Sequence, residues 1–81
     1  MINRDLLEEL CEGNDSTADL CAKLLEDNPN ADEYELADMF ADSLVGFYDP
    51  DNGLTEKEHW DNNREWGWVI FSEYFDEVED E

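Results

Sequence analysis

The chain has 81 residues, enough for one domain with a modest core. Its formal net charge is −21, because 25 Asp and Glu face only 4 Lys and Arg. Such a charge repels nucleic acid and anionic membranes and attracts basic surfaces, so direct DNA binding is nearly excluded. Disordered acidic chains lack apolar residues. This one is 41% hydrophobic and 12% aromatic, so we expect it to fold.

The first ten residues carry three acids and no apolar core of a signal peptide. No apolar run approaches the ~20 residues that span a bilayer. We therefore expect a cytoplasmic protein without a membrane partner. Cys11 and Cys21 form no CxxC pair and the chain has one histidine, so a zinc site is not indicated. We expect each cysteine to pack, reduced, as a small apolar residue.

The first two segments have apolar residues at helical spacing. Asn3 is a suitable N-cap for a helix over about 3–12, and Gly13 suits the left-handed position after it. Ser16, with an aspartate three residues later, predicts the start of a second helix through a capping box. This helix should end two residues before Pro29, since the residue before proline disfavours helical geometry.

Two longer helices follow. Asn30, with a glutamate three residues on, predicts the cap of a helix that extends to about residue 48. A last helix over about 56–78 is apolar over a wide arc, so it should be largely buried. Gly67 costs about 1 kcal/mol relative to alanine in a helix, which leaves a kink or break open there. The aromatic and β-branched residues of 66–75 leave a short strand open as an alternative.

These patterns predict an all-α fold, a small bundle of three to four helices with an acidic surface. The whole chain, 1–81, forms a single domain in this interpretation. Its end, "DEVEDE", is expected to form a frayed acidic tail over 77–81.

The stretch "DPDNGLTEKEHW", residues 49–60, looks like a calcium loop but fails on register. The EF-hand loop needs twelve residues with a bidentate glutamate at the twelfth. Placing Gly53 at the sixth position puts His59 where that glutamate should be. The stretch instead encodes a turn followed by a capping box between Thr55 and Glu58. A calcium site or loose cation binding stays only as an alternative to this interpretation.

Catalytic patterns are weak. His59 is the only histidine, and no serine or cysteine is linked to it by spacing. With 25 acids, some carboxylate pair will always lie at a separation suited to glycoside hydrolysis, so that signal carries no information. The four glycines stand far apart and form no phosphate loop. We therefore expect a protein that is not an enzyme and that needs no cofactor or metal.

The acid itself is the main signal. An ordinary charged surface mixes signs, because interspersed Lys and Arg form stabilising i, i+4 pairs. The third helix has no basic residue, and the fourth has only Lys57 and Arg64. We therefore predict acidic faces on these helices and their connecting turn as the partner-binding residues: Asp32, Glu33, Glu35, Asp38, Asp42, Asp49, Asp51, Asp61, Glu65, Glu73, Asp76 and Glu77.

The charge is comparable with that of DNA. B-DNA presents one negative charge per ~1.7 Å of axis, so 21 charges correspond to about 35 Å of duplex. A compact domain of this length is roughly 25–30 Å across. Helices would hold carboxylates at fixed spacings, and a cleft lined by Lys and Arg would gain counterion release by binding them.

In size, acidity, helices rich in aromatic residues and acidic end, the chain resembles the small DNA-mimic proteins of phages and mobile elements. These include Ocr-type antirestriction proteins and acidic anti-CRISPR proteins. The resemblance covers the character of the whole chain, without an aligned motif, so it carries over no contact residue. It implies an inhibitor that occupies the nucleic-acid site of a restriction enzyme, a CRISPR effector or another DNA-binding protein in a bacterial cytoplasm.

A second interpretation is an acidic adaptor or antitoxin-like module whose affinity comes from an apolar groove. In both, the partner is a basic protein and not nucleic acid itself. A homodimer would lengthen the acidic surface and stays open.

Overall fold

The computed structural model describes residues 2–79, which contain α-helices and 3₁₀ turns but no strand. The elements are α1 (Arg4–Leu10), α2 (Asp15–Asp27), α3 (Glu33–Leu44), η1 (Val45–Phe47), η2 (Pro50–Asn52) and α4 (Glu56–Glu79). The predicted all-α bundle is therefore confirmed, and the strand alternative for 66–75 is wrong. None of these helices is long and apolar enough to cross a membrane.

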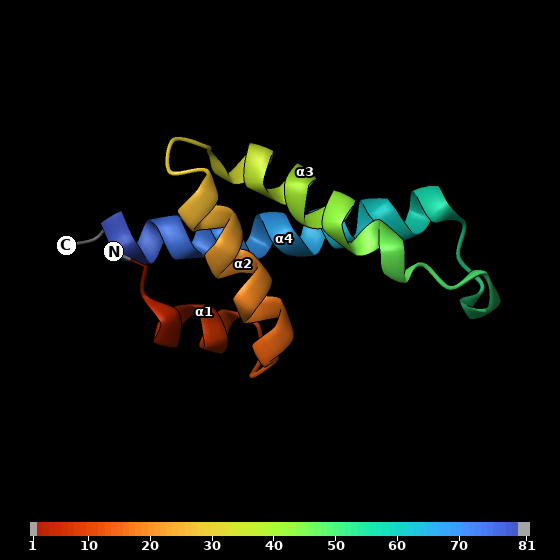
Figure 1. Ribbon diagram of the computed structural model, residues 1–81, viewed down its shortest axis with the longest axis horizontal. Helices are drawn as coiled ribbons and strands as arrows, with labels where there is room; N and C mark the ends of the chain where they lie inside the picture. The colour runs from red at the N-terminus through yellow and green to blue at the C-terminus, as the bar shows by residue number, and fades with distance from the viewer. Residues whose placement is uncertain (1, 80–81) are drawn as a thin grey trace.

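The longest helix sets the shape of the molecule. Its 24 residues, at about 1.5 Å each, extend α4 over roughly 36 Å. The molecule measures 43 × 24 × 19 Å, so the expected width of 25–30 Å is wrong along the long axis. Figure 1 shows α3 lying along α4, with α1 and α2 covering the half that holds the start of α3 and the end of α4.

The cap of α1 was predicted correctly, but α2 begins earlier than expected. The Asn3 Oδ1 accepts from the Leu6 N–H at 3.1 Å. For α2 the cap is Asn14, whose Oδ1 accepts from the Thr17 N–H at 3.0 Å, and not Ser16. Asparagine, aspartate and serine follow one another here and each is a good cap residue, so the sequence did not decide between them.

The cap of α3 is also displaced by two residues. Asn30 is not the cap, because a turn closed by the Ala31 N–H and the Asn28 carbonyl at 3.1 Å precedes the helix. Asp32 caps it by accepting from the Glu35 N–H at 2.8 Å. The helix ends at Leu44 and does not reach residue 48, because the chain tightens into η1.

The predicted turn and capping box before α4 are confirmed. Gly53 has φ +87°, the left-handed conformation that ends η2. The Thr55 Oγ1 accepts from the Glu58 N–H at 3.1 Å, and the Glu58 carboxylate accepts from the Thr55 N–H at 3.1 Å. The helix then continues through residues 77–79, the first part of the expected tail. Residues 80 and 81 of the expected tail lie outside the described residues.

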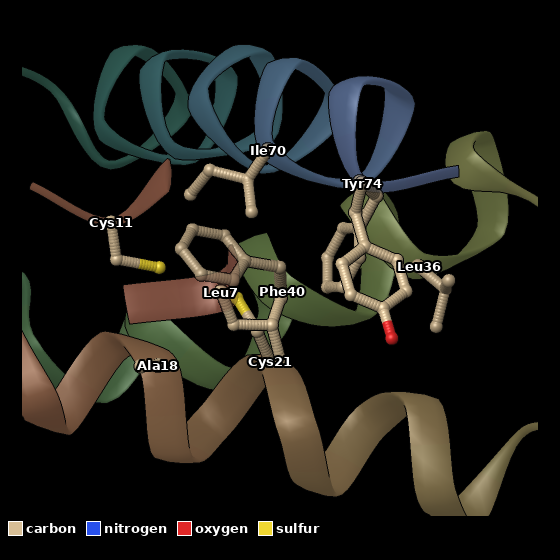
Figure 2. Close-up of a cluster of buried hydrophobic side chains, with 9 residues drawn as sticks. Leu7, Cys11, Ala18, Cys21, Leu36, Phe40, Ile70 and Tyr74 are labelled. Carbon is tan, nitrogen blue, oxygen red and sulfur yellow. The ribbon is translucent and has the colours of Figure 1, made fainter. Parts of the chain in front are cut away.

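The core lies between α1, α2, α3 and the second half of α4 (Figure 2). Its buried members are Leu7, Cys11, Ala18, Cys21, Leu36, Phe40, Ile70, Phe71 and Tyr74. Phe40 is at its centre, with edge-to-face contacts to Trp66 and Phe71 at centroid distances of 5.6 and 6.3 Å. The cysteines are free thiols packed among apolar side chains, and burial raises the pKa of both.

Gly67 of α4 packs directly against the Phe40 side chain of α3, and it is not a break in the helix. The α4 helix passes through it without interruption. A Cβ at this position would lie 2.8 Å from Cδ1 and 3.0 Å from Cγ of Phe40. Glycine therefore makes room for the central core residue, and the expected loss of helix propensity is offset by packing.

Candidate partner-binding surface

The antiparallel pairing of α3 and α4 is marked by a row of cross-helix contacts, here called the outer seam. It consists of Tyr34 with Trp68, Asp38 with Arg64, and Asp42 with Trp60. The rings of Tyr34 and Trp68 have centroids 6.2 Å apart. Asp38 and Arg64 form an ion pair, and the indole Nε1–H of Trp60 donates to the Asp42 Oδ1 at 2.8 Å. Each step rises four residues on α3 and falls four on α4, about one turn.

Some of the acids expected on each of these two helices lie at this outer seam. Glu35, Asp38 and Asp42 share one side of α3, since they are three and four residues apart. Asp61 and Glu65 are one turn apart on α4 and line a hollow of about 420 Å³ at the outer seam. The sequence placed these residues on two separate helices, and the antiparallel register brings these parts of the two helices together.

The other candidates are distributed along the molecule. Asp32, Glu33 and Asp76 line a second hollow of about 360 Å³, where the start of α3 meets the end of α4. Asp51 lies in η2 and Asp49 is the residue before it. This turn is at the opposite end of the long axis in Figure 1.

Two candidates near the end of α4 do not join the outer seam. Glu77 faces α1, where it lines a hollow with Asp5 and Glu9. Glu73 is exposed on α4 and lines none of the hollows described here. The acid at this end of the molecule therefore points in more than one direction.

The structure also shows which carboxylates already hold an internal contact. Five of the predicted residues do: Asp32 caps α3, Asp38 pairs with Arg64, Asp42 accepts from Trp60, Asp49 accepts from the Asp51 N–H, and Asp61 pairs with Lys57. Within residues 2–79 the other seven have no hydrogen-bonded or ionic side-chain partner: Glu33, Glu35, Asp51, Glu65, Glu73, Asp76 and Glu77. These seven carboxylates are therefore left without an internal side-chain contact.

Basic residues neutralise little of this surface. Arg4 pairs with Asp19 at 2.6 Å and with Glu8 at 3.4 Å, and these contacts raise its pKa. Lys57 pairs with Asp61 at 2.9 Å, which raises the lysine pKa. Without the acids at 80 and 81, 19 net negative charges lie along 43 Å, or one per roughly 2.3 Å, against ~1.7 Å in B-DNA.

His59 packs between helices. Its Nε2 lies 2.9 Å from the Leu44 carbonyl oxygen and 3.1 Å from the Asn63 Nδ2, and its ring lies against Tyr48 at 5.4 Å. These contacts give the histidine a packing role at the end of α3 and the start of α4. Across residues 2–79, His, Cys, Asp and Glu form no group of three or more that could hold a metal ion.

Three surface aromatics were not singled out from the sequence. Tyr34 is 53% exposed and Phe47 is 78% exposed, although both recur at helical spacing with the other apolar residues of 31–48. Trp68 lines the hollow at the outer seam. Periodicity predicts which side of a helix is apolar. The neighbouring helix decides which edge of that side stays exposed.

No protein-family model matches the chain. Searches of curated proteins and of solved structures also found no match.

Proposed function

We propose that this protein is a DNA mimic that binds a basic nucleic-acid-binding protein through the acidic surface of α3 and α4. The observation that carries the proposal is the row of carboxylates along both sides of the outer seam, on an elongated molecule whose charge per length approaches that of a duplex. The bound protein would occupy the partner's nucleic-acid site and inhibit it without chemistry.

The packing supports a stable presentation of this charge. The outer seam contacts fix α3 against α4, so carboxylates such as Glu35 and Glu65 project from helices and not from loops. A partner's Lys and Arg would release their counterions by binding them, as they do with phosphates. Binding should therefore weaken steeply with salt and compete with duplex DNA.

The resemblance described above adds the target class to the proposal. A restriction enzyme, a CRISPR effector or another DNA-binding protein of a bacterial cytoplasm would present such a basic cleft. The proposal includes no enzymatic activity and no cofactor.

One observation favours the adaptor or antitoxin-like function as a second candidate. Phe47 is 78% exposed and borders a hollow of about 380 Å³ with Leu20 and Leu44. An aromatic side chain beside an apolar hollow is typical of an interface anchor. In this alternative the groove supplies affinity, and neither salt nor DNA changes binding much.

An affinity capture from a bacterial lysate, repeated with excess duplex DNA, separates the two functions. The test variant combines Glu35→Gln, Glu65→Gln, Glu73→Gln and Asp76→Asn, four carboxylates without internal partners. The matched control combines Glu9→Gln, Glu12→Gln, Glu26→Gln and Asp27→Asn, exposed acids on or beside α1 and α2 with the same change in charge.

We expect the wild type and the control to capture nucleic-acid-binding proteins that DNA displaces, and the test variant to lose most of them. Capture that DNA leaves unchanged would favour the adaptor. Equal loss from both variants would show that total charge, and not the surface of α3 and α4, governs binding.

A further inference from the structure

The hollow on the outer seam is lined by Tyr34, Asp61, Arg64, Glu65 and Trp68 and has a volume of about 420 Å³. Two aromatic rings form part of its wall, with centroids 6.2 Å apart and planes inclined by 34°. Tyr34 is 53% exposed, so part of this aromatic pair is accessible to a partner.

The charges around the hollow leave room for one cation. Arg64 is neutralised by Asp38 across the outer seam, and Asp61 is paired with Lys57. Glu65 is the carboxylate of the lining that has no ionic partner within the described chain. A single positive group entering the hollow would therefore meet one uncompensated negative charge beside two aromatic rings.

Trp68 differs from Trp60, although both lie on the same row. The indole of Trp60 donates to Asp42, whereas the Nε1 of Trp68 is buried without a partner in residues 2–79. A buried donor without an acceptor costs about 1–3 kcal/mol. Trp68 thus forms part of the wall of the hollow, and no internal acceptor offsets the cost of burying its donor.

We propose that this hollow receives an arginine side chain of the partner, which lies on the aromatic faces and pairs with Glu65. A guanidinium stacks on aromatic faces and matches a carboxylate with its fixed fork of donors, whereas an ammonium is a compact, strongly hydrated charge. A nucleobase would bring its phosphate towards the acidic surface and be repelled. The inference rests on the proposed function for the identity of the partner, but its test does not.

The test uses short acetylated and amidated peptides of glycine with two arginines, or with two lysines in their place. Each is titrated into ¹⁵N-labelled protein, and the indole N–H resonances are followed, with Trp60 on the same row as the internal control. We expect a saturable shift of the Trp68 resonance with the arginine peptide, and an at least twofold weaker affinity for the lysine peptide.

Two substitutions test the parts of the site. Tyr34→Leu keeps an apolar side chain at an exposed position but removes the aromatic face, so it should weaken arginine-peptide binding about two- to fivefold. Glu65→Gln should weaken it at least as much, whereas Glu26→Gln, the same charge change at an exposed site on α2, should leave it within about twofold. Equal shifts of all indoles, equal affinity for both peptides, or equal effects of the two glutamate changes would overturn the proposal.

The outcomes also separate this inference from the proposed function. If DNA displaces the captured proteins but Trp68 shows no arginine-specific response, the DNA-mimic function stands and the arginine site in the hollow is refuted. If Trp68 responds specifically to arginine but no nucleic-acid-binding protein is captured, the arginine site stands and the DNA-mimic function is refuted.

Discussion

Replacing Gly67 by alanine should destabilise the protein, although alanine is the better helix former. The substitution gains about 0.8–1 kcal/mol of helix propensity. Its Cβ, however, would lie 2.8, 3.0 and 3.1 Å from Cδ1, Cγ and Cβ of Phe40, where ordinary contacts are 3.4–4 Å. Phe40 is fully buried, and Trp66 and Phe71 pack edge-to-face with its ring, so it has little room to withdraw.

Forcing extra atoms into a packed core costs about 1–3 kcal/mol. Because the ring is confined, we place Gly67→Ala in the upper part of that range, which leaves a net loss of about 1–2 kcal/mol after the propensity gain. Urea unfolding followed by tryptophan fluorescence measures this, with the midpoint moving to lower urea and the slope unchanged. In a thermal melt each kcal/mol lowers Tm by about 4–8 °C for a domain of this size.

Two further variants make the result interpretable. Gly46→Ala has no heavy atom within 4 Å of the new Cβ, so it should be neutral or slightly stabilising. Combining Gly67→Ala with Phe40→Leu should cost less than the two single changes added together, because the smaller side chain makes room for the new methyl group. A Gly67→Ala variant that is about 1 kcal/mol more stable than wild type would refute the close-packing argument.

Other predictions concern the start of α4 and the exposed side chain of Phe47. Thr55→Ala should cost about 1 kcal/mol by removing the cap, whereas Thr55→Ser should be near neutral; equal melting temperatures for the two would contradict the capping box. The Thr55 N–H lowers the pKa of Glu58 below the ordinary 4.5, so its stabilisation is present above that pH and lost as pH falls through the lower folded value. The difference in Tm between wild type and Glu58→Gln should accordingly be seen near pH 7 and fade towards about pH 3 in circular-dichroism melts, and a difference that grows on acidification would refute it. Phe47→Ser should change stability by less than about 0.5 kcal/mol, since the side chain is 78% exposed; a larger loss in urea unfolding would show that the ring packs in solution.

Local signals predicted the fold well where a feature lies within a few residues. The capping box of Thr55 and Glu58 spans four positions, and both of its hydrogen bonds form. The starts of α2 and α3 were missed because several good cap residues follow one another. The choice between Asn14 and Ser16 depends on the residue at which the backbone first turns into the helix. Periodicity gives a helix but leaves its first turn undetermined.

Features that depend on two helices were beyond the sequence. Propensity identified Gly67 as a weak point, but the reason for glycine is Phe40, 27 residues away on another helix. Likewise the acids of α3 and α4 were found, but not that Asp38 and Asp42 hold the antiparallel register. Such a register depends on how two helices pack against each other, which the period of neither helix contains.

The acid has opposite effects on folding and on the proposed binding, and the outer seam explains how both are accommodated. Net repulsion among the exposed carboxylates opposes the compact state. Asp38 and Asp42 instead join α3 to α4 through Arg64 and Trp60, so part of the acid strengthens the scaffold that carries the rest. The carboxylates without internal partners, such as Glu35 and Glu65, contribute mainly repulsion to the isolated molecule. A basic surface that covered them would relieve this repulsion, so the free energy that the repulsion costs the folded molecule would add to the affinity of the proposed complex.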